Sequence, residues 1–176
     1  MTMVTKGKSQ SKEADWLTLD EMKTWRVLHE VVTGLPVVLG DELRREVDLS
    51  FLEYYVLAGL SEQPNHSLRM SQLALLANSE LSRLSHLVGR LEKRGLVRRR
   101  PDPTDGRFNL AVLTSAGRKL VGQAAPLHVK HVRQLIFDVL DESEQHALRN
   151  GLMKVRGEII RQLLDRSPGL VIPTEI

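Results

Sequence analysis

The sequence predicts a mainly α-helical protein with one short β-hairpin, and three observations support this fold class. Apolar residues recur at three- and four-residue spacing towards both ends of the chain, as on the buried face of a helix. Residues 70–97 have the pattern of two short helices that are separated by a tight break and ended by Gly95. Three arginines, a turn-rich segment at 101–107 and a strand-like segment follow directly. Two such helices and a hairpin predict a winged helix–turn–helix.

The N-terminal part of the chain is expected to be an arm followed by helix. Residues 1–15 are polar and rich in Lys and Ser, which is typical of a disordered segment. An apolar helical pattern begins near Leu17. Gly34 and Pro36 lie inside this pattern and predict a kink or two abutting helices.

Capping residues predict where the next elements begin. Ser50 and Glu53 have the spacing of a capping box and start a helix. Residues 68–70 can form a very short strand. Ser71 is the expected cap of the first helix of the helix–turn–helix pair, over 72–77.

The second helix of the pair is expected over 79–94 and carries the candidate DNA contacts. Asn78 lies in the break before it, where a left-handed conformation is needed. Apolar residues at spacings of three and four form its core face: Leu81, Leu84, Val88 and Leu91. Polar side chains that can bond base edges or phosphates lie opposite: Ser82, Arg83, Ser85, His86 and Arg90. Gly89 on that face allows close backbone approach. The alternative is a surface helix of an all-α protein, which the following hairpin disfavours.

A basic hairpin is expected next, with strands at 97–100 and 109–113. Its turn contains Pro and Asp-Gly and holds Arg107 near the tip. An arginine there suits a narrow, electronegative minor groove. Asp105 can brace this guanidinium by a charge-assisted bond, and this is compatible with the alternative of a simple surface ion pair.

Positive charge is concentrated in this central part of the chain. Residues 69–107 contain nine Arg or Lys against four Asp or Glu, a net charge of +5, whereas the whole chain carries +3. Such clustering is typical of phosphate binding, although many charge runs are only solvated surface. Aromatic residues make up 4%, which argues against stacking on single strands. The absence of cysteine excludes disulfides, thiolate zinc sites and thiol redox sensing.

Two further helices are expected after the hairpin. Thr114 or Ser115 caps the first, which Pro126 bends. Asp141 and Glu144 have capping-box spacing at the start of the second. Apolar residues of this last helix repeat in a heptad-like stripe: Leu148, Leu152, Val155, Ile159 and Leu163.

These segments resemble the MarR family of bacterial transcription regulators and its winged helix–turn–helix. The resemblance is carried by LANSELSRLSHLVGRLEKRGLVRR and DPTDGRFNLAVLTSAGR. It extends to Trp25, LEYYVLAGLSE and AAPLHVKHVRQLIFDVLDESEQ, which are similar to the soil-actinobacterial branch. By position, the major-groove contacts match Ser82, Arg83, Ser85 and His86, and backbone contacts match Arg90, Arg98 and Arg99. Asp105 and Arg107 match the D-x-R of the wing, and Ser79 completes the expected DNA-binding set. His86 stands where many relatives have Arg or Gln.

A homodimer follows from the apolar stripes and from the resemblance. The stripes near both ends are too extensive for one small winged core to cover, and an intramolecular bundle is the alternative. A symmetric dimer sets two recognition helices about one DNA turn (~34 Å) apart and predicts a near-palindromic site. We expect five segments: an arm at 1–15, N-terminal dimerisation helices at 16–49, a winged helix–turn–helix lobe at 50–114, C-terminal dimerisation helices at 115–166 and a tail at 167–176.

The resemblance also implies a small, anionic aromatic effector that lowers DNA affinity. Four residues are candidates for lining its site, although aromatic residues at helical spacing more often belong to a core: Trp25, His29, Tyr54 and Tyr55. His128 and His131 are three apart on a helix, a spacing that can ligate a metal. Solvated or dimer-facing histidines are the preferred interpretation, so no metal and no cofactor are expected.

The expected function is therefore sequence-specific binding of double-stranded operator DNA by a homodimeric transcriptional regulator, most simply a repressor. An architectural DNA-binding protein of low specificity and a winged-helix protein-interaction module are the alternatives. The sequence shows no phosphate loop, nucleophile elbow or paired catalytic acids, so an enzyme is not expected. No signal-peptide core or membrane-length apolar run is present, which makes a cytoplasmic protein the expectation.

Overall fold

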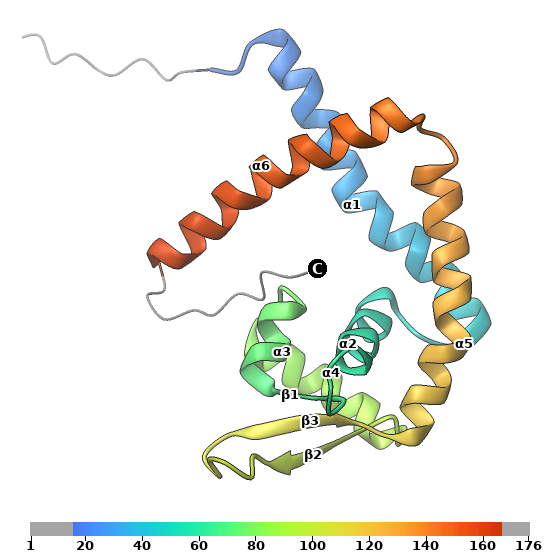
Figure 1. The fold of residues 1–176 in the computed structure, drawn as a ribbon, viewed down its shortest axis with the longest axis vertical. Coiled ribbons are helices and arrows are strands. Elements are labelled where there is room, and N and C mark those ends of the chain that lie inside the picture. Colours follow the sequence, from blue (N-terminus) through green and yellow to red (C-terminus); the bar gives the residue numbers. More distant parts are fainter. Residues whose placement is uncertain (1–15, 167–176) are drawn as a thin grey trace, which may run out of the picture. The chain divides into compact units, whose positions relative to one another are not determined.

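The computed structural model describes residues 16–166 (Figure 1). The expectations for 1–15 and 167–176 lie outside these residues. The elements in chain order are α1 (Leu19–Val47), α2 (Phe51–Ser61), β1 (Ser67–Arg69), α3 (Met70–Leu76), α4 (Leu81–Lys93), β2 (Val97–Pro101), β3 (Asn109–Leu113), α5 (Ser115–Val132), the π-helical turn η1 (Arg133–Phe137) and α6 (Glu142–Arg166). Contacts divide the chain into two compact units, Met1–Leu35 and Pro36–Ile176.

The described part of the first unit is the beginning of α1. Thr18 caps it, because the Thr18 N–H and hydroxyl donate to Glu21 (2.7 and 2.8 Å) and the Glu21 N–H donates back (3.3 Å). The helix continues through Pro36 to Val47, so the alternative of two abutting helices was wrong, while the kink stays a prediction. Proline has no backbone N–H, so the carbonyl four residues before Pro36 lacks its helical donor. Because Pro36 is exposed, water can bond this carbonyl instead.

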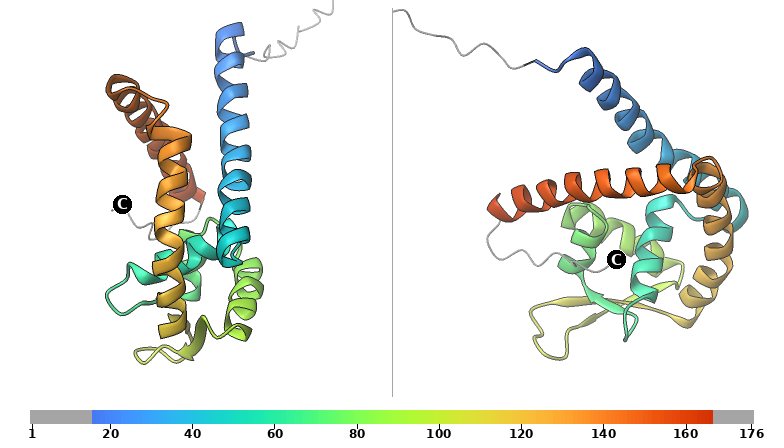
Figure 2. Two further views of the ribbon diagram at one scale, coloured as in Figure 1. Left: turned by 90° about the vertical axis from the view of Figure 1, so that its right-hand side faces the viewer. Right: turned by 45° about the horizontal axis from the view of Figure 1, so that its top comes forward.

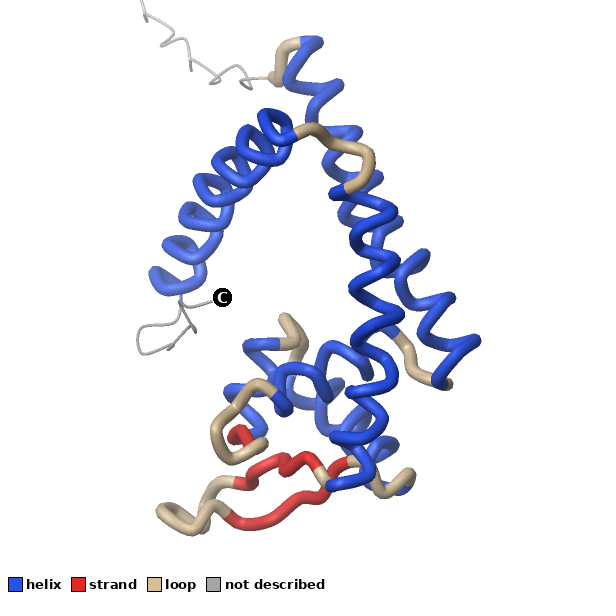
Figure 3. Tube along the Cα trace, turned by 45° about the vertical axis from the view of Figure 1, so that its right-hand side comes forward, coloured by secondary structure: helices blue, strands red, loops and turns tan. Residues whose placement is uncertain are grey.

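The second unit contains a three-stranded antiparallel sheet in the order β1-β3-β2. Ala111 at the centre of β3 pairs with Leu68 on one side and with Arg99 on the other. The β2–β3 hairpin extends away from helices α2–α4, and its loop continues beyond the strands (Figures 2 and 3). The winged helix–turn–helix predicted from the sequence is thus confirmed.

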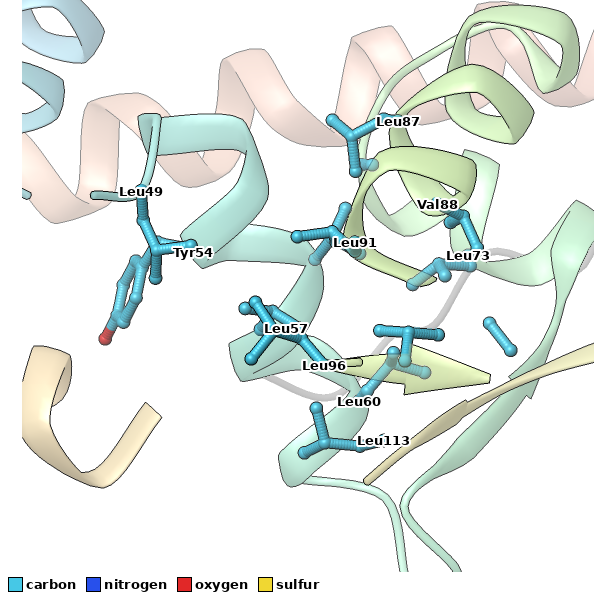
Figure 4. Packing of buried hydrophobic residues seen from close by; sticks show 14 of the residues in the cluster. Leu49, Tyr54, Leu57, Leu60, Leu73, Leu87, Val88, Leu91, Leu96 and Leu113 are labelled. Carbon is cyan, nitrogen blue, oxygen red and sulfur yellow. The ribbon is translucent and has the colours of Figure 1, made fainter. Parts of the chain in front are cut away.

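One hydrophobic core joins α2, α3, α4, the sheet and the first turns of α5. Leu57 of α2, Leu73 of α3 and Leu91 of α4 lie together in it and are fully buried (Figure 4). Each fully buried leucine stabilises the fold by roughly 1.5–3 kcal/mol, so this core holds α4 firmly against α2 and α3.

Local capping signals account for the confirmed boundaries. The Glu53 N–H donates to Ser50 Oγ (3.2 Å) and the Ser50 N–H donates to Glu53 (2.9 Å), which completes the predicted capping box. Thr114 caps α5 by accepting from the Gly117 N–H (3.0 Å), whereas Ser115 is already helical. Asp141 and Glu144 form the predicted box before α6 through bonds of 2.9 Å in both directions.

Two expectations in the helix–turn–helix pair were wrong. Ser71 does not cap α3, because the helix starts at Met70 and Arg69 is its N-cap. Leu81 does not belong to the core face of α4: it is the first residue of the helix and 53% exposed, while Leu87 is buried. The buried stripe is therefore Leu84, Leu87, Val88 and Leu91, the i, i+3, i+4, i+7 pattern of a wider apolar face.

Within residues 16–166, no helix is long and apolar enough to span a bilayer.

Candidate nucleic-acid interface

The turn between α3 and α4 has the left-handed residue that the sequence predicted. Asn78 has a φ of 44°, and the Ser79 N–H donates to the Ala74 carbonyl (2.9 Å). Gly95 after α4 has a φ of 71° and ends the helix as expected. The helix itself is shorter than the predicted 79–94, so Ser79 lies before its N-cap residue Glu80.

The outward face of α4 is polar. Ser82, Arg83 and His86 are exposed, and Ser85 is half-buried beside them. A shallow hollow of about 570 Å³ adjoins this face and is lined by Ser50, Leu52, Ser82, Arg83, His86, Leu87 and Arg90. The predicted major-groove contacts therefore share one surface, and their hydroxyl, guanidinium and imidazole groups are the types that bond base edges.

Arg99 of β2 lies across α4 at Gly89. Its N–H and Nε donate to Glu92 (2.8 and 2.9 Å), which lowers the pKa of Glu92, and its Nη1 is 3.4 Å from Ser85 Oγ. A Cβ atom on Gly89 would come within 3.1 Å of Arg99 Nη2. Gly89, which the sequence interpretation assigned to close backbone approach, thus also makes room for this guanidinium.

Arg90 is an expected backbone contact that already has an acidic partner. Its Nε is 3.8 Å from Glu53, the capping residue of α2, and Arg94 is 4.0 Å from the same carboxylate. Arg94 also donates to the Asp48 carbonyl (2.8 Å). These pairs fasten the end of α4 to the start of α2.

The wing presents Arg107 as the sequence predicted. The Arg107 guanidinium donates to Asp105 through Nε and Nη2 (3.0 and 2.7 Å), and the Arg107 N–H adds a third bond (3.1 Å). The bonds from Arg107 hold the pKa of Asp105 below its ordinary value. The Phe108 N–H donates to the Asp105 carbonyl (3.0 Å), so the acid and the arginine belong to one closed turn.

Four residues that the sequence interpretation missed complete the wing. Asp102 is 6% exposed and accepts from the Thr104 N–H and hydroxyl (2.8 and 2.7 Å) and from Arg69 Nε (2.6 Å). The Thr104 bonds, followed by those of Arg69, lower the pKa of Asp102 to about 2. The Arg69 Cζ atom lies 4.6 Å from the centre of the Phe108 ring.

Three further arginines of this surface have no acidic partner among the described residues. In the described part of the chain, Arg83, Arg98 and Arg100 are exposed and form no ion pair. Phosphate contacts from such arginines supply affinity that depends on salt but not on sequence.

The four effector candidates fall into two pairs. Trp25 and His29 lie together in the first unit, with ring centres 6.0 Å apart. Tyr54 is buried in the core of the second unit, where burial raises its pKa, and Tyr55 stacks on Phe51 (6.2 Å). An effector site lined by these residues stays a prediction.

His128 is half-buried rather than solvated, and the alternative that it faces a dimer partner stays a prediction. Its ring is 4.7 Å from the Tyr54 ring, and burial, followed by the nearby His131, lowers the pKa of His128. His131 Nε2 lies 3.6 Å from Glu42. Across residues 16–166, no group of three or more His, Asp or Glu residues could hold a metal ion.

Comparison with solved structures identifies the family. Sco3205 from Streptomyces coelicolor, a MarR family transcriptional regulator solved in complex with DNA, is 40% identical with a TM-score of 0.77. The match covers 84% of this chain and 91% of Sco3205. The chain belongs to the MarR family. The MarR family profile matches residues 47–107, from the end of α1 to the tip of the wing.

Curated relatives of the chain are named as transcriptional regulators. YfiV of Bacillus subtilis, an uncharacterized HTH-type transcriptional regulator, is 31% identical over 139 residues, 77% of this chain and 82% of YfiV. The transcriptional regulator HosA of Escherichia coli O111:H- is 35% identical over 82 residues, which are 46% of this chain. The match spans 58% of the length of HosA. The MarR family resemblance predicted from the sequence is confirmed, and its similarity to the soil-actinobacterial branch agrees with solved relatives from Streptomyces coelicolor.

Proposed function

We propose that this MarR-family chain is a sequence-specific regulator that binds double-stranded operator DNA, acts as a repressor and catalyses no reaction. One observation carries the proposal: the exposed polar face of α4 stands beside a wing whose Arg107 is held by Asp105. The similarity to Sco3205, a transcriptional regulator whose structure is a complex with DNA, supports the same role. A DNA-bound regulator acts in the cytoplasm.

In this proposal α4 lies in the major groove and the wing in the adjacent minor groove. Arg83 and His86 bond base edges, and Ser79, Ser82 and Ser85 add contacts near the start of the helix. Arg98 and Arg99 contact the phosphate backbone, and Arg90 does so while it remains close to Glu53. Arg107 enters the minor groove with Asp105 as its brace.

A homodimer is part of the proposal. The apolar stripe of α6 is exposed in the single chain, each side chain by 42–54%: Leu148, Leu152, Val155, Ile159 and Leu163. A contiguous exposed stripe of this kind is typical of an interface. A second copy of the chain would bury it and place two winged lobes on a near-palindromic operator. The proposed parts are the dimerisation segments 16–49 and 115–166 and the DNA-binding lobe 50–114.

Release by a small aromatic anion is the regulatory part of the proposal. The effector must prefer one dimer geometry over the other, because a ligand of equal affinity for both shifts no equilibrium. Trp25 is its candidate reporter: a saturable change in tryptophan fluorescence together with weaker operator binding supports this part.

Selection from random double-stranded DNA tests the proposed function. We expect the parent to select a near-palindrome, and Arg83→Ala and His86→Ala to change the preferred bases. Lys154→Ala on α6 removes one exposed cation away from α4 and should leave the preference unchanged. An unchanged preference in both α4 variants would refute base contacts by this helix. If the protein binds duplex DNA but selects no consensus sequence, the result favours an architectural DNA-binding protein. If it binds no duplex even at low salt, the result favours a protein-interaction module.

A further inference from the structure

Phe108 is an apolar ring that the hydrophobic core does not explain. It is 40% exposed and lies on the wing, outside the buried cluster. Both backbone polar groups of Phe108 are nevertheless hydrogen-bonded. The Asp102 N–H donates to the Phe108 carbonyl (2.9 Å), and the Phe108 N–H donates to the Asp105 carbonyl (3.0 Å). The ring is therefore placed at the base of the turn that carries Arg107.

Two guanidinium groups flank this ring. Arg69 Cζ lies 4.6 Å from the ring centre, and Arg107 Cζ lies at 6.0 Å, the outer limit of a cation–π contact. The register explains the first contact, because Arg69 pairs with Leu110 in β3 and Phe108 precedes Leu110 by two residues. Such diagonal neighbours are within reach of aromatic and long side chains.

Each of these two arginines also donates a hydrogen bond to a different aspartate. Arg69 Nε donates to the buried Asp102 (2.6 Å), and Arg69 Nη2 is 3.3 Å from the Thr104 hydroxyl. Arg107 donates to Asp105 (2.7 Å). The result is an alternating row of charge and ring that we call the wing stack: Asp102, Arg69, Phe108, Arg107 and Asp105.

We propose that Arg69 and Phe108 are positioning residues that aim Arg107 at the minor groove and so contribute to the base preference of the wing. This inference rests on the proposed DNA-binding function. An exposed arginine on a turn has many rotamers, and ordering it on binding costs conformational entropy. The wing stack limits these rotamers before DNA arrives, because the guanidinium donates to Asp105 and its Cζ lies 6.0 Å from the centre of the Phe108 ring. Arg69 anchors the ring to β1, an element outside the hairpin.

The test uses the full chain and two duplexes with the selected site, one with A·T and one with G·C pairs in the flanks that face the wings. Narrow A-tract minor grooves attract inserted arginine, so the parent should prefer the A·T duplex, and Arg107→Ala should reduce this preference to about one. We expect Phe108→Leu and Arg69→Gln each to lower the preference for the A·T duplex about two- to fivefold. This fold-change corresponds to the free energy of one exposed cation–π contact. Phe108→Tyr keeps an aromatic face and should retain the preference.

A second measurement in the free protein separates orientation from folding. Ring currents of Phe108 should shift the Nε–Hε resonances of Arg69 and Arg107 in the parent, and Phe108→Leu should abolish these shifts while the melting temperature stays close to that of the parent. Unshifted resonances in the parent would overturn the wing stack.

The outcomes distinguish this inference from the function on which it rests. If Arg107→Ala loses the flank preference but Phe108→Leu and Arg69→Gln keep it, the inference is wrong and the proposed function stands. If the parent binds DNA without any flank preference, the aiming of Arg107 at the minor groove is wrong. If the parent binds no duplex at low salt, the proposed function fails and the inference fails with it.

Discussion

Substitution of Gly89 by alanine is expected to stabilise the protein and to weaken DNA binding. Gly89 lies inside α4, where alanine is more favourable than glycine by about 1 kcal/mol. For a chain of this size, 1 kcal/mol corresponds to a rise in Tm of roughly 2–4 °C. The new Cβ would approach Arg99 Nη2 to 3.1 Å, and the guanidinium must move by a few tenths of an ångström or more.

The lengths of the Arg99 hydrogen bonds indicate which of its contacts should break in this variant. Its backbone N–H and Nε remain tied to Glu92 at 2.8 and 2.9 Å, whereas the contact to Ser85 is already long at 3.4 Å. The end of the guanidinium therefore leaves the surface of α4. Loss of one phosphate contact makes the slope of log affinity against log salt concentration shallower by about 0.9. The affinity of the variant relative to that of the parent should therefore rise about threefold between roughly 50 and 200 mM salt.

Thermal melting and anisotropy titrations across a salt series measure both effects. Gly122→Ala in α5 is the matched control, because no atom lies within 4 Å of its added Cβ and it should raise the Tm without a change in DNA binding. A double-mutant cycle with Arg99→Gln separates two roles of Gly89. If Gly89 acts through Arg99, the double variant binds like Arg99→Gln alone, whereas additive losses indicate that Gly89 itself approaches DNA. Parent-like affinity and salt slope for Gly89→Ala would refute the reasoning.

Three further predictions concern stability. Ser50→Ala removes the capping box of α2 and should cost about 1 kcal/mol, which a thermal melt detects as a fall in Tm of roughly 2–4 °C; an unchanged Tm contradicts this. The pKa of Asp102 is lowered from 3.8 to about 2, so its stabilising contribution is present above 3.8 and is lost as the pH falls toward 2. The difference in unfolding free energy between the parent and Asp102→Asn should shrink over that range in urea titrations, and a constant difference would count against the bracing role. Burial and His131 lower the pKa of His128 below 6.5, so the unfolded chain binds this proton more readily and the parent loses stability as the pH falls below 6.5. His128→Gln should lose less over the same range, and equal losses would show that His128 is not the group responsible.

Local chemistry explains what could be predicted from the sequence. The capping residues Ser50 and Thr114 act on N–H groups three residues away, so their patterns alone indicate where helices begin. Gly95 and Asn78 likewise satisfy a backbone requirement of their own positions. The ion pair between Asp105 and Arg107 was predictable because the two residues are only two positions apart in the sequence.

Long-range packing explains what could not be predicted. Arg69 and Asp102 are 33 residues apart, and their ion pair depends on the β1–β3 register, which no local pattern reveals. Leu81 follows the helical spacing of the core stripe, but its place in the first turn leaves it outside the packed face. The half-burial of His128 could not be predicted, because its contact with Tyr54 joins α5 to α2 across a long separation in the sequence.

Dimethyl sulfate protection of the selected operator tests the central claim most directly, since this reagent methylates guanine N7 in the major groove and adenine N3 in the minor groove. We expect the parent to protect guanine N7 within each half-site, where α4 lies, and adenine N3 in the flanks, where Arg107 lies. Arg107→Ala should lose only the adenine protection. Protection of neither position in a complex that is fully formed would contradict the placement of α4 and the wing in the two grooves.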